Sequence, residues 1–273
     1  MDKINISVVI PVYNAEKTII KCLNSVISEL QTINCVWEIF TVDDGSRDNS
    51  SVLINNFIIE NNFTSKIKYY YQQNKGAGAA RNKGIESSNG DFIAFNDSDD
   101  MWVEGKMKKQ IEIFIQYPDV DMVGGLHDTI NISSFWYKEG DCSRISLKDL
   151  IYKFYFTTPG VMFRKEILIK SGLFNSTQRN AEEGLFFYRM SYFGKCILVN
   201  QVFSKNVLGK SSWGESGLSS QIHKQSRGEL NNLYSIYKEG LINTKDYMFA
   251  TVFSLLKYLR RILIFYYYRL NKL

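Results

Sequence analysis

The sequence has few of the residues that bind soft metals or form disulfide frameworks. Its 273 residues include only two histidines, His127 and His223, and four widely separated cysteines with no C-x-x-C pair. We therefore expect reduced, buried thiols rather than a disulfide scaffold or a Cys/His zinc site. A metal ion in this protein would have to depend mainly on carboxylates.

Signals of export and of membrane spanning are also lacking. Residues 6–10 form an apolar run close to the N-terminus, and no basic leader with an apolar region and cleavage site precedes it. We expect an unprocessed cytosolic protein. Charged residues interrupt every candidate run of 18 apolar residues at the C-terminal end, which disfavours a spanning helix. The net charge of +5 is modest, and we expect no nucleic-acid partner.

The C-terminal segment contains no acidic residue after Asp246. On a helical wheel, its five basic residues fall on one half and its leucines on the other. This pattern favours a basic amphipathic helix that lies on an anionic membrane surface. Packing of the helix on its own domain and a dimer contact are the alternatives. The basic residues are Lys257, Arg260, Arg261, Arg269 and Lys272.

The first half of the chain alternates between β-rich apolar runs and segments with helical spacing. An apolar content of 45%, with 14% aromatics, supports a sizeable core. Alternating strands and helices predict an α/β fold with a mostly parallel sheet, covered by helices on both faces. We expect strands at 6–13, 37–42, 67–71, 92–95 and 120–123, and helices at 15–30, 48–59 with Asp48 as N-cap, 78–86 and 106–116.

The second half is less regular. We expect one continuous domain with halves at 1–125 and 126–225, followed by a helical, membrane-associating tail at 226–273. Residues 204–220 are rich in polar residues and are expected to form a mobile loop. The other expected elements are helices at 146–154, 164–171 and 181–193, an extended segment at 157–163 and a strand at 196–203.

Acidic residues follow two of the predicted strands. Asp43 and Asp44 follow the second strand, and Asp97, Asp99 and Asp100 follow the fourth. In parallel sheets, ligands bind beyond the carboxyl ends of the strands. If the segment stays extended, Asp97 and Asp99 point to one side, and Ser98 and Asp100 point to the other. The cluster suits a hard divalent metal that carries substrate phosphates, although a solvated turn after a strand is the simpler alternative.

Several short motifs occur together and in a fixed order. They are Pro11-Val-Tyr-Asn14, Val42-Asp-Asp-Gly-Ser-Arg-Asp48, Gly76-Ala-Gly-Ala-Ala-Arg-Asn82, Asp97-Ser-Asp-Asp100, Thr158-Pro-Gly-Val161 and Glu182-Glu183. Each motif alone is weak, but the ordered set is specific. By these residues the chain resembles inverting glycosyltransferases of family 2, which have the GT-A fold. The resemblance covers roughly residues 4–225.

The resemblance implies a nucleotide-sugar donor, usually a UDP-sugar, and a divalent cation, Mn²⁺ or Mg²⁺, that bridges its diphosphate. Asp97-Ser98-Asp99 matches the D-x-D motif of the family, with Asp99 as metal ligand and Asp97 on the ribose or on a metal-bound water. The other donor-binding positions implied are Pro11, Tyr13 and Asn14 around the nucleotide, and Asp43 or Asp44 facing the uracil or ribose.

The catalytic base is implied at Glu183, with Glu182 as the second choice. The family usually has Glu-Asp here, so the side chain of Glu183 is one methylene longer. Ala181 and Gly184 also replace residues that are often bulkier. A purely structural alternative is that acids in a first helical turn interact favourably with the helix dipole.

Three further positions carry open alternatives. Arg81 either approaches the donor phosphates and orders the acidic pocket, or is a solvated arginine on a helix surface. His223, next to the loop that closes over the donor in the family, either makes an additional metal or phosphate contact or is a structural or solvated histidine. Thr158-Pro-Gly160 either places backbone near the acceptor or is a plain turn.

The resemblance implies metal-dependent transfer of a hexose from a UDP-sugar to an acceptor hydroxyl, with inversion. The natural acceptor would be a polyprenyl-diphosphate-linked glycan at the inner face of the cell membrane, as in O-antigen or capsule synthesis. A catalytically impaired nucleotide-sugar-binding module is the alternative. A nicotinamide dehydrogenase is disfavoured because the first βα turn, at 13–16, lacks glycine. An Asp-x-Asp phosphatase is disfavoured because that motif would follow the first strand.

Overall fold

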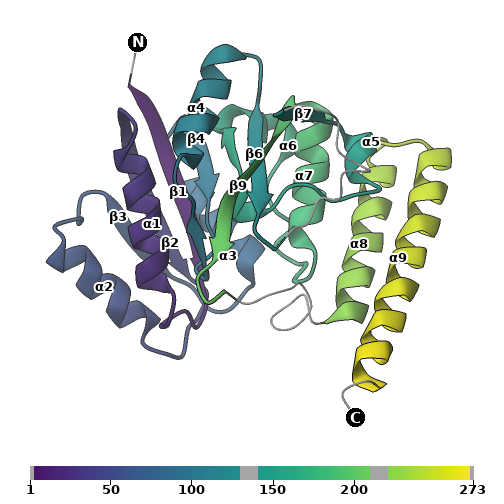
Figure 1. Cartoon of the computed structure of the whole chain (residues 1–273), viewed down its shortest axis with the longest axis horizontal. Coiled ribbons are helices and arrows are strands. Elements are labelled where there is room, and N and C mark those ends of the chain that lie inside the picture. The colour runs from purple at the N-terminus through teal and green to yellow at the C-terminus, as the bar shows by residue number, and fades with distance from the viewer. Residues whose placement is uncertain (1–2, 130–140, 210–220, 271–273) are drawn as a thin grey trace.

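The computed structural model describes residues 3–129, 141–209 and 221–270, without the side chains of 266–270. Strands and helices alternate through the first half, as the sequence predicts (Figure 1). These elements are β1 (Ile4–Val12), α1 (Ile19–Gln31), β2 (Cys35–Asp43), α2 (Ser50–Glu60), β3 (Ile67–Tyr71), α3 (Ala77–Ser87) and β4 (Phe92–Phe95).

The second half adds shorter elements and ends in two long helices. The strands and helices are β5 (Asp100–Trp102), α4 (Lys106–Gln116), β6 (Met122–His127), β7 (Cys142–Ile145), α5 (Leu147–Leu150), β8 (Met162–Arg164), α6 (Leu168–Ser171), α7 (Glu182–Phe193), β9 (Cys196–Asn206), α8 (Ile222–Lys238) and α9 (Thr244–Leu270). Two 3-10 turns lie at Thr158–Gly160 and Lys165–Ile167.

All described strands belong to one sheet in the order β3-β2-β1-β4-β8-β6-β9-β5, and β7 also pairs with β9. β1 pairs in parallel with β2 and β4, and β2 pairs in parallel with β3. β8 runs antiparallel to its neighbours β4 and β6. The carboxyl ends of β1, β2 and β4 therefore meet at one edge of the sheet, where ligands bind in folds of this kind.

The sheet separates two hydrophobic clusters. In β1, Ile6, Val8 and Ile10 pack with α1, α2 and α4 on one face, whereas Val9 packs with α3, α5 and α7 on the other. This alternation follows from the two-residue period of a strand. Helices thus cover both faces, and the predicted α/β architecture is confirmed.

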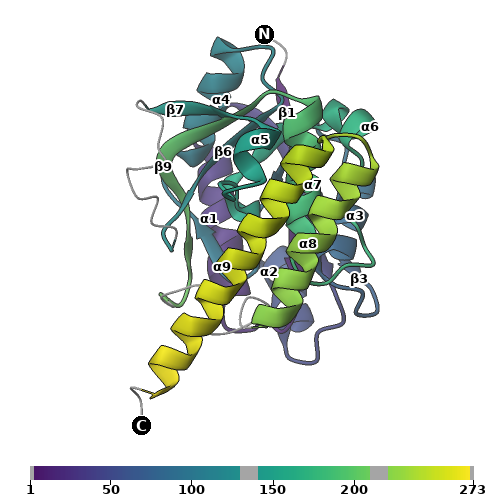
Figure 2. The same ribbon diagram turned by 90° about the vertical axis from the view of Figure 1, so that its right-hand side faces the viewer.

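α8 and α9 pack side by side against the second of these clusters, at the end of the molecule away from β3 (Figures 1 and 2). In Figure 2, α9 runs obliquely across the near face and its C-terminal end projects below the body. The predicted C-terminal helices are therefore present.

The first two loops differ in detail from the sequence-based expectation. α1 begins at Ile19 rather than at residue 15, because Asn14 has a φ of +50° and the carbonyl of Ala15 accepts the amides of Thr18 and Ile19 in a turn. Asp48 is not the N-cap of α2, which is Asn49. The Asp48 carboxylate instead accepts the amides of Glu16 and Ser50, and so ties the first loop to the second.

The other differences lie in the second half. The helix expected at 146–154 is limited to α5, and the helix expected at 164–171 is divided between the end of β8, a 3-10 turn and α6. Residues 158–160 form a 3-10 turn instead of an extended segment. The first part of the expected loop, Ser204–Asn206, completes β9, and residues 210–220 lie outside the described residues.

Candidate functional site

A cavity of about 1010 Å³ opens at the carboxyl ends of β1, β2 and β4. Loops far apart in the sequence meet there because the parallel strands end at the same edge. Most of the residues singled out in the sequence line this cavity, and they are Pro11, Tyr13, Asn14, Asp44, Arg81, Asp97, Ser98, Asp99, Glu182 and Glu183.

The loops after β1 and β2 are joined by hydrogen bonds. The Asn14 amide donates to Ser46 Oγ at 3.0 Å, and Asn14 Oδ1 accepts the Arg47 amide at 2.8 Å. These bonds hold the left-handed backbone of Asn14 and leave the Tyr13 ring half exposed at the cavity. Hydrogen bonds between backbone amides and side chains thus fix the first wall of the cavity, in addition to side-chain packing.

The two acids after β2 have different positions. Asp43 accepts Tyr69 Oη at 2.8 Å and the Ser46 amide at 2.7 Å, and it does not line the cavity. Asp44 lines the cavity and accepts the amides of Lys75 and Gly76 at 2.7 and 2.8 Å. Of the two alternatives predicted for the nucleotide, Asp44 therefore has the suitable position.

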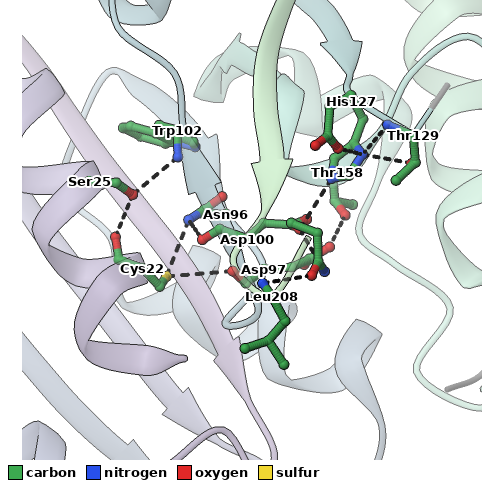
Figure 3. Close-up of polar contacts among 12 residues, drawn as sticks. Cys22, Ser25, Asn96, Asp97, Asp100, Trp102, His127, Thr129, Thr158 and Leu208 are labelled. Atoms are coloured by element: carbon green, nitrogen blue, oxygen red, sulfur yellow. Dashed lines mark hydrogen bonds and ion pairs between the residues drawn. The ribbon is translucent and has the colours of Figure 1, made fainter. Parts of the chain in front are cut away.

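Residues 97–100 form a turn after β4 rather than an extended segment, because the Asp100 amide donates to the Asp97 carbonyl at 3.0 Å. Asp97, Ser98 and Asp99 line the cavity. Asp100 is buried and faces away, with His127 Nε2 at 3.2 Å from its carboxylate (Figure 3). The carboxylates are thus divided as expected, although a turn produces the division. The expected position of Ser98 on the side of Asp100 is wrong, because in the turn Ser98 lines the cavity with Asp97 and Asp99.

Arg81 is buried, with only 5% of its surface exposed, so the alternative of a solvated surface arginine is wrong. Its guanidinium donates to Asp97 at 2.6 Å, to Thr158 Oγ1 at 3.2 Å and to Glu182 at 3.3 Å. Thr158 Oγ1 in turn donates to the second oxygen of Asp97 at 2.8 Å. Burial by itself would lower the pKa of Arg81, but Asp97 and Glu182 outweigh it and raise the pKa. Arg81 therefore stays charged and orders the acidic wall.

Asp99 is accessible from the cavity, but the surrounding protein and two neighbouring carboxylates act on it. The surrounding protein partly removes the Asp99 carboxyl group from water, and Asp100 and Asp97 repel its negative charge. Together these effects raise the pKa of Asp99 to about 6, with desolvation as the larger cause. A cation next to Asp99 would relieve this repulsion. The described residues contain no group of three or more His, Cys, Asp or Glu that could hold a metal by themselves. A Mg²⁺ site shared with substrate phosphates needs only one or two carboxylates, so Asp99 with Asp97 fits such an ion.

α7 begins at the residues predicted to carry the catalytic base. Ala181 precedes it with a φ of +55°, and its carbonyl accepts Asn232 Nδ2 at 2.7 Å from α8. The glycine at position 184 has a steric reason, because a Cβ there would lie 2.5 Å from the same Asn232 nitrogen. The small residues that depart from the family pattern thus allow α8 to pack closely behind Glu183.

Glu182 and Glu183 have different environments. Glu182 is buried and paired with Arg81, whereas the half-buried Glu183 lines the cavity without a cationic partner within ion-pair distance among the residues described. Burial, followed by the charge of Glu182, raises the pKa of Glu183 above the ordinary range of a carboxyl group. A raised pKa suits a general base that must accept a proton from a sugar hydroxyl.

Some residues of the site were not anticipated, and besides Asp43 a second predicted residue, His223, does not line the cavity. His223 bonds to Tyr258 Oη at 2.7 Å and is not among the residues that line the cavity, so its contact with metal or phosphate stays a prediction. Lys17, Leu208 and Gln225 line the cavity, and no motif in the sequence marks them. Their positions follow only from the way the loops and α8 meet.

Comparison with known proteins agrees with this geometry. The model of the family "Glycosyl transferase family 2" matches residues 7–186. The chain therefore belongs to glycosyl transferase family 2.

Curated relatives are glycosyltransferases as well. The chain is 32% identical to an uncharacterized glycosyltransferase of Nostoc over 70% of this chain and 60% of that protein. It is 34% identical to the Escherichia coli UDP-Glc:alpha-D-GlcNAc-diphosphoundecaprenol beta-1,3-glucosyltransferase WfgD over 49% of this chain and 50% of that protein. An uncharacterized glycosyltransferase of Rickettsia bellii is 28% identical over 89% of this chain. The chain spans only 32–60% of the length of these relatives.

Two solved structures share the GT-A fold. The mannosyltransferase PcManGT of Pyrobaculum calidifontis, in complex with GDP-Man and Mn²⁺, has a TM-score of 0.69 at 13% identity, covering 93% of this chain and 74% of that chain. TarS 1-349 of S. aureus, in complex with UDP-GlcNAc, has a TM-score of 0.65 at 20% identity, covering 85% and 66%. At these identities the likeness concerns the fold.

Replacing Arg81 tests whether it holds the acidic wall together. The Arg81→Met variant keeps an unbranched apolar stem but removes the guanidinium and leaves two neighbouring carboxylates without their cation, so we expect a loss of about 3 kcal/mol in the free energy of unfolding. Urea denaturation measures this loss. Arg179→Gln is the matched control, because exposed Arg179 bonds only to Asn74 among the described residues, and we expect a change within about 0.5 kcal/mol. Equal effects of the two substitutions would contradict the assignment.

Proposed function

We propose that the protein is a metal-dependent, inverting glycosyltransferase that moves a hexose from a UDP-sugar to an acceptor hydroxyl. One observation carries the proposal: the D-x-D carboxylates and the half-buried Glu183 line the same cavity, at the carboxyl ends of parallel strands. The first group suits a diphosphate with its cation, and the second suits proton removal from an acceptor.

The donor nucleotide binds against the loops after β1 and β2. Pro11, Tyr13 and Asn14 form one wall, and the remaining acceptor capacity of the Asp44 carboxylate faces the uracil or ribose. TarS and its complex with UDP-GlcNAc support a UDP-sugar, because the proteins share this fold. The complex of PcManGT contains GDP-Man, so GDP-sugars belong in any test of the donor.

Asp99 would hold the divalent cation, Mn²⁺ or Mg²⁺, and Asp97 would orient the ribose or a metal-bound water from its fixed position beside Arg81 and Thr158. The ion would neutralise the diphosphate as it departs, which is Lewis-acid assistance to the leaving group. Arg81 keeps Asp97 in place and compensates its charge, so the wall stays ordered before the donor binds.

Glu183 acts as the general base. It removes the proton of the attacking hydroxyl, and Glu182, held by Arg81, keeps the start of α7 in register. The proton passes to the Glu183 carboxylate while the hydroxyl oxygen forms the new bond to the anomeric carbon and the UDP leaves from the opposite face. Such a base contributes about 10²- to 10⁴-fold in rate.

A glycan on a polyprenyl diphosphate is the acceptor class that we propose, and the name of WfgD, whose acceptor is a diphosphoundecaprenol-linked sugar, supports it. Such a substrate places the protein at the inner face of the cell membrane, in assembly of a surface polysaccharide such as O-antigen. No helix within the described part of the chain is long and apolar enough to cross a bilayer.

α9 supplies the membrane contact in this proposal. Its apolar side chains point outward, and they include Met248, Phe249, Val252, Leu255, Leu256, Leu259, Leu263 and Phe265. Contiguous exposed apolar surface of this kind marks a membrane or protein interaction site. The predicted basic half is only partly available for lipid, because Lys257 and Arg261 face the protein body, whereas Arg260 is exposed.

The experiment that tests the proposal is a panel of UDP- and GDP-sugars with lipid-diphosphate-linked GlcNAc or GalNAc, with and without Mn²⁺, assayed for nucleotide release. Turnover with one donor is the expected result. Binding of a nucleotide sugar without release, for every donor and acceptor, would instead favour the second function class, a nucleotide-sugar-binding module. The glutamate pair at the position of the customary Glu-Asp is the observation that favours this alternative.

Asp99→Asn tests the metal site. We expect Mn²⁺ to strengthen UDP binding to the parent protein, and this gain to disappear in the variant while metal-free UDP binding stays unchanged. Calorimetric titration of UDP with and without Mn²⁺ measures both. Asp91→Asn serves as control, because exposed Asp91 lies before β4, at the opposite end of the same strand. A full Mn²⁺ effect in Asp99→Asn would show that the ion binds elsewhere.

Glu183→Gln tests the base. We expect turnover to fall by about 10²- to 10⁴-fold while UDP affinity is retained, and Glu183→Asp to keep part of the activity. In the parent protein, kcat/KM rises with pH as Glu183 loses its proton. Because its pKa is raised, this rise lies above the range near 4.3 of an ordinary glutamate. A variant as active as the parent, or a flat pH profile above pH 5, is incompatible with Glu183 as base.

Leu259→Ser combined with Leu263→Ser tests the membrane contact. Each exposed leucine that enters lipid contributes roughly 1.5–3 kcal/mol, so we expect at least tenfold weaker flotation with vesicles of anionic phospholipid. Ile169→Ser is the control, because this residue on α6 is 89% exposed and distant in sequence from α9. Full vesicle binding after deletion of residues 247–273, or a dimer that only the leucine variant dissociates, would contradict the proposal.

A further inference from the structure

A second cavity, of about 230 Å³, adjoins the first. Ala181, Glu183 and Gln225 line both cavities, so the proposed base lies where they meet. The remaining walls come from residues 150–154, α7, α8 and α9. No residue of the loops after β1, β2 or β4 contributes to it, and it is therefore separate from the nucleotide pocket.

Cations prevail in this second cavity. Lys153, Lys257 and Arg261 line it, together with the acid Glu229 and the base Glu183. Arg261 pairs with Glu229 at 2.7 Å. Lys257 contacts the carbonyl of Tyr152 at 3.3 Å and the ring of Phe253, and no carboxylate among the described residues lies within ion-pair distance of it. Burial lowers the pKa of Lys257, a cost that a bound anion would offset.

The orientation of α9 supports a role for these cations. A surface helix normally turns its apolar side chains inward and its charges outward. α9 does the opposite around the cavity, because Lys257 and Arg261 point to the body while Leu255, Leu259 and Leu263 are exposed. Tyr247 and Phe253 also pack inward, against Tyr237 and Tyr152, together with the small buried side chains of Ala250 and Ser254. Lys257 and Arg261 are thus charged residues on the side of α9 that packs on the protein body.

We propose that this cavity is an acceptor subsite that binds the diphosphate of a lipid-linked glycan, with Lys257 and Arg261 as its ligands. The first sugar then extends past Ala181 to Glu183, where its hydroxyl is deprotonated. The lipid chain leaves along the outward apolar side of α9. This inference rests on the proposed function and adds to it the residues that select a phosphate-bearing acceptor.

The volume and the neighbours of the cavity fit this occupant. A cavity of about 230 Å³ is smaller than typical ligand pockets of about 300–1,000 Å³, so it suits a compact charged group rather than a lipid chain. Lys257 and Arg261 can both donate charge-assisted hydrogen bonds to phosphate oxygens, and the diphosphate would share Arg261 with Glu229. A neutral sugar would accept hydrogen bonds from these cations but would not compensate their charge.

Binding of farnesyl diphosphate tests the subsite without knowledge of the acceptor sugar. The full chain is first saturated with UDP and Mn²⁺, so that the donor site is filled, and farnesyl diphosphate is then titrated in the calorimeter. We expect binding to the parent protein, and affinity reduced on the order of tenfold in both Lys257→Gln and Arg261→Gln, since a charge-assisted contact is worth about 1.5–3 kcal/mol. Arg260→Gln is the matched control, because Arg260 neighbours Arg261 on α9 but is exposed.

Glu229→Gln separates ligand binding from a structural role of the ion pair. If Arg261 only stabilises α8 against α9, removal of either partner has the same effect. If Arg261 binds the anion, loss of the competing carboxylate leaves affinity unchanged or raises it, in contrast to Arg261→Gln. Thermal melting of each variant verifies that it is folded.

The outcomes are distinct. Absence of farnesyl diphosphate binding overturns the subsite, as does equal weakening by Arg260→Gln and Arg261→Gln, or by Glu229→Gln and Arg261→Gln. Failure of the parent protein to bind UDP in the first step overturns the proposed function instead. Weakening confined to Lys257→Gln and Arg261→Gln supports the subsite.

Discussion

The ion pairs of Arg81 with Asp97 and Glu182 join the parts of the molecule on which the site depends. Arg81 comes from α3, Asp97 from the turn after β4, and Glu182 from the start of α7. Their charges could not be buried together without the guanidinium, because uncompensated carboxylates in a protein interior are costly. One side chain thus connects the donor wall to the helix that carries the proposed base.

Among the residues that the structure describes, no cationic side chain lies within ion-pair distance of Asp99 or Glu183. Arg81 compensates Asp97 and Glu182, whereas burial and the neighbouring acids raise the pKa of Asp99 and of Glu183. Sites in which some carboxyl groups are paired with a cation and others have a raised pKa are typical of proteins where the groups have different tasks. Asp99 gains from a cation and Glu183 gains from a proton, which corresponds to the two roles proposed for them.

The two faces of α9 also differ in chemical character. Its inner face has the cations that line the second cavity, and its outer face has apolar side chains that are exposed within the described part of the chain, among them Leu255, Leu259 and Leu263. A helix that lies between an anion-binding subsite and a membrane needs charged side chains toward the subsite and apolar side chains toward the lipid. Donor, base and lipid-linked acceptor would then lie in sequence from the strand ends to α9.

The sequence by itself determined the α/β fold and most residues of the cavity wall, because hydrophobic period and ordered motifs are local properties. It did not determine that Arg81 is buried, that Asp44 rather than Asp43 reaches the cavity, or that residues 97–100 turn. Helical spacing also placed the charges of α9 on one face without showing that Lys257 and Arg261 face the body. Only the tertiary structure decided these points, since each depends on contacts between segments far apart in the chain.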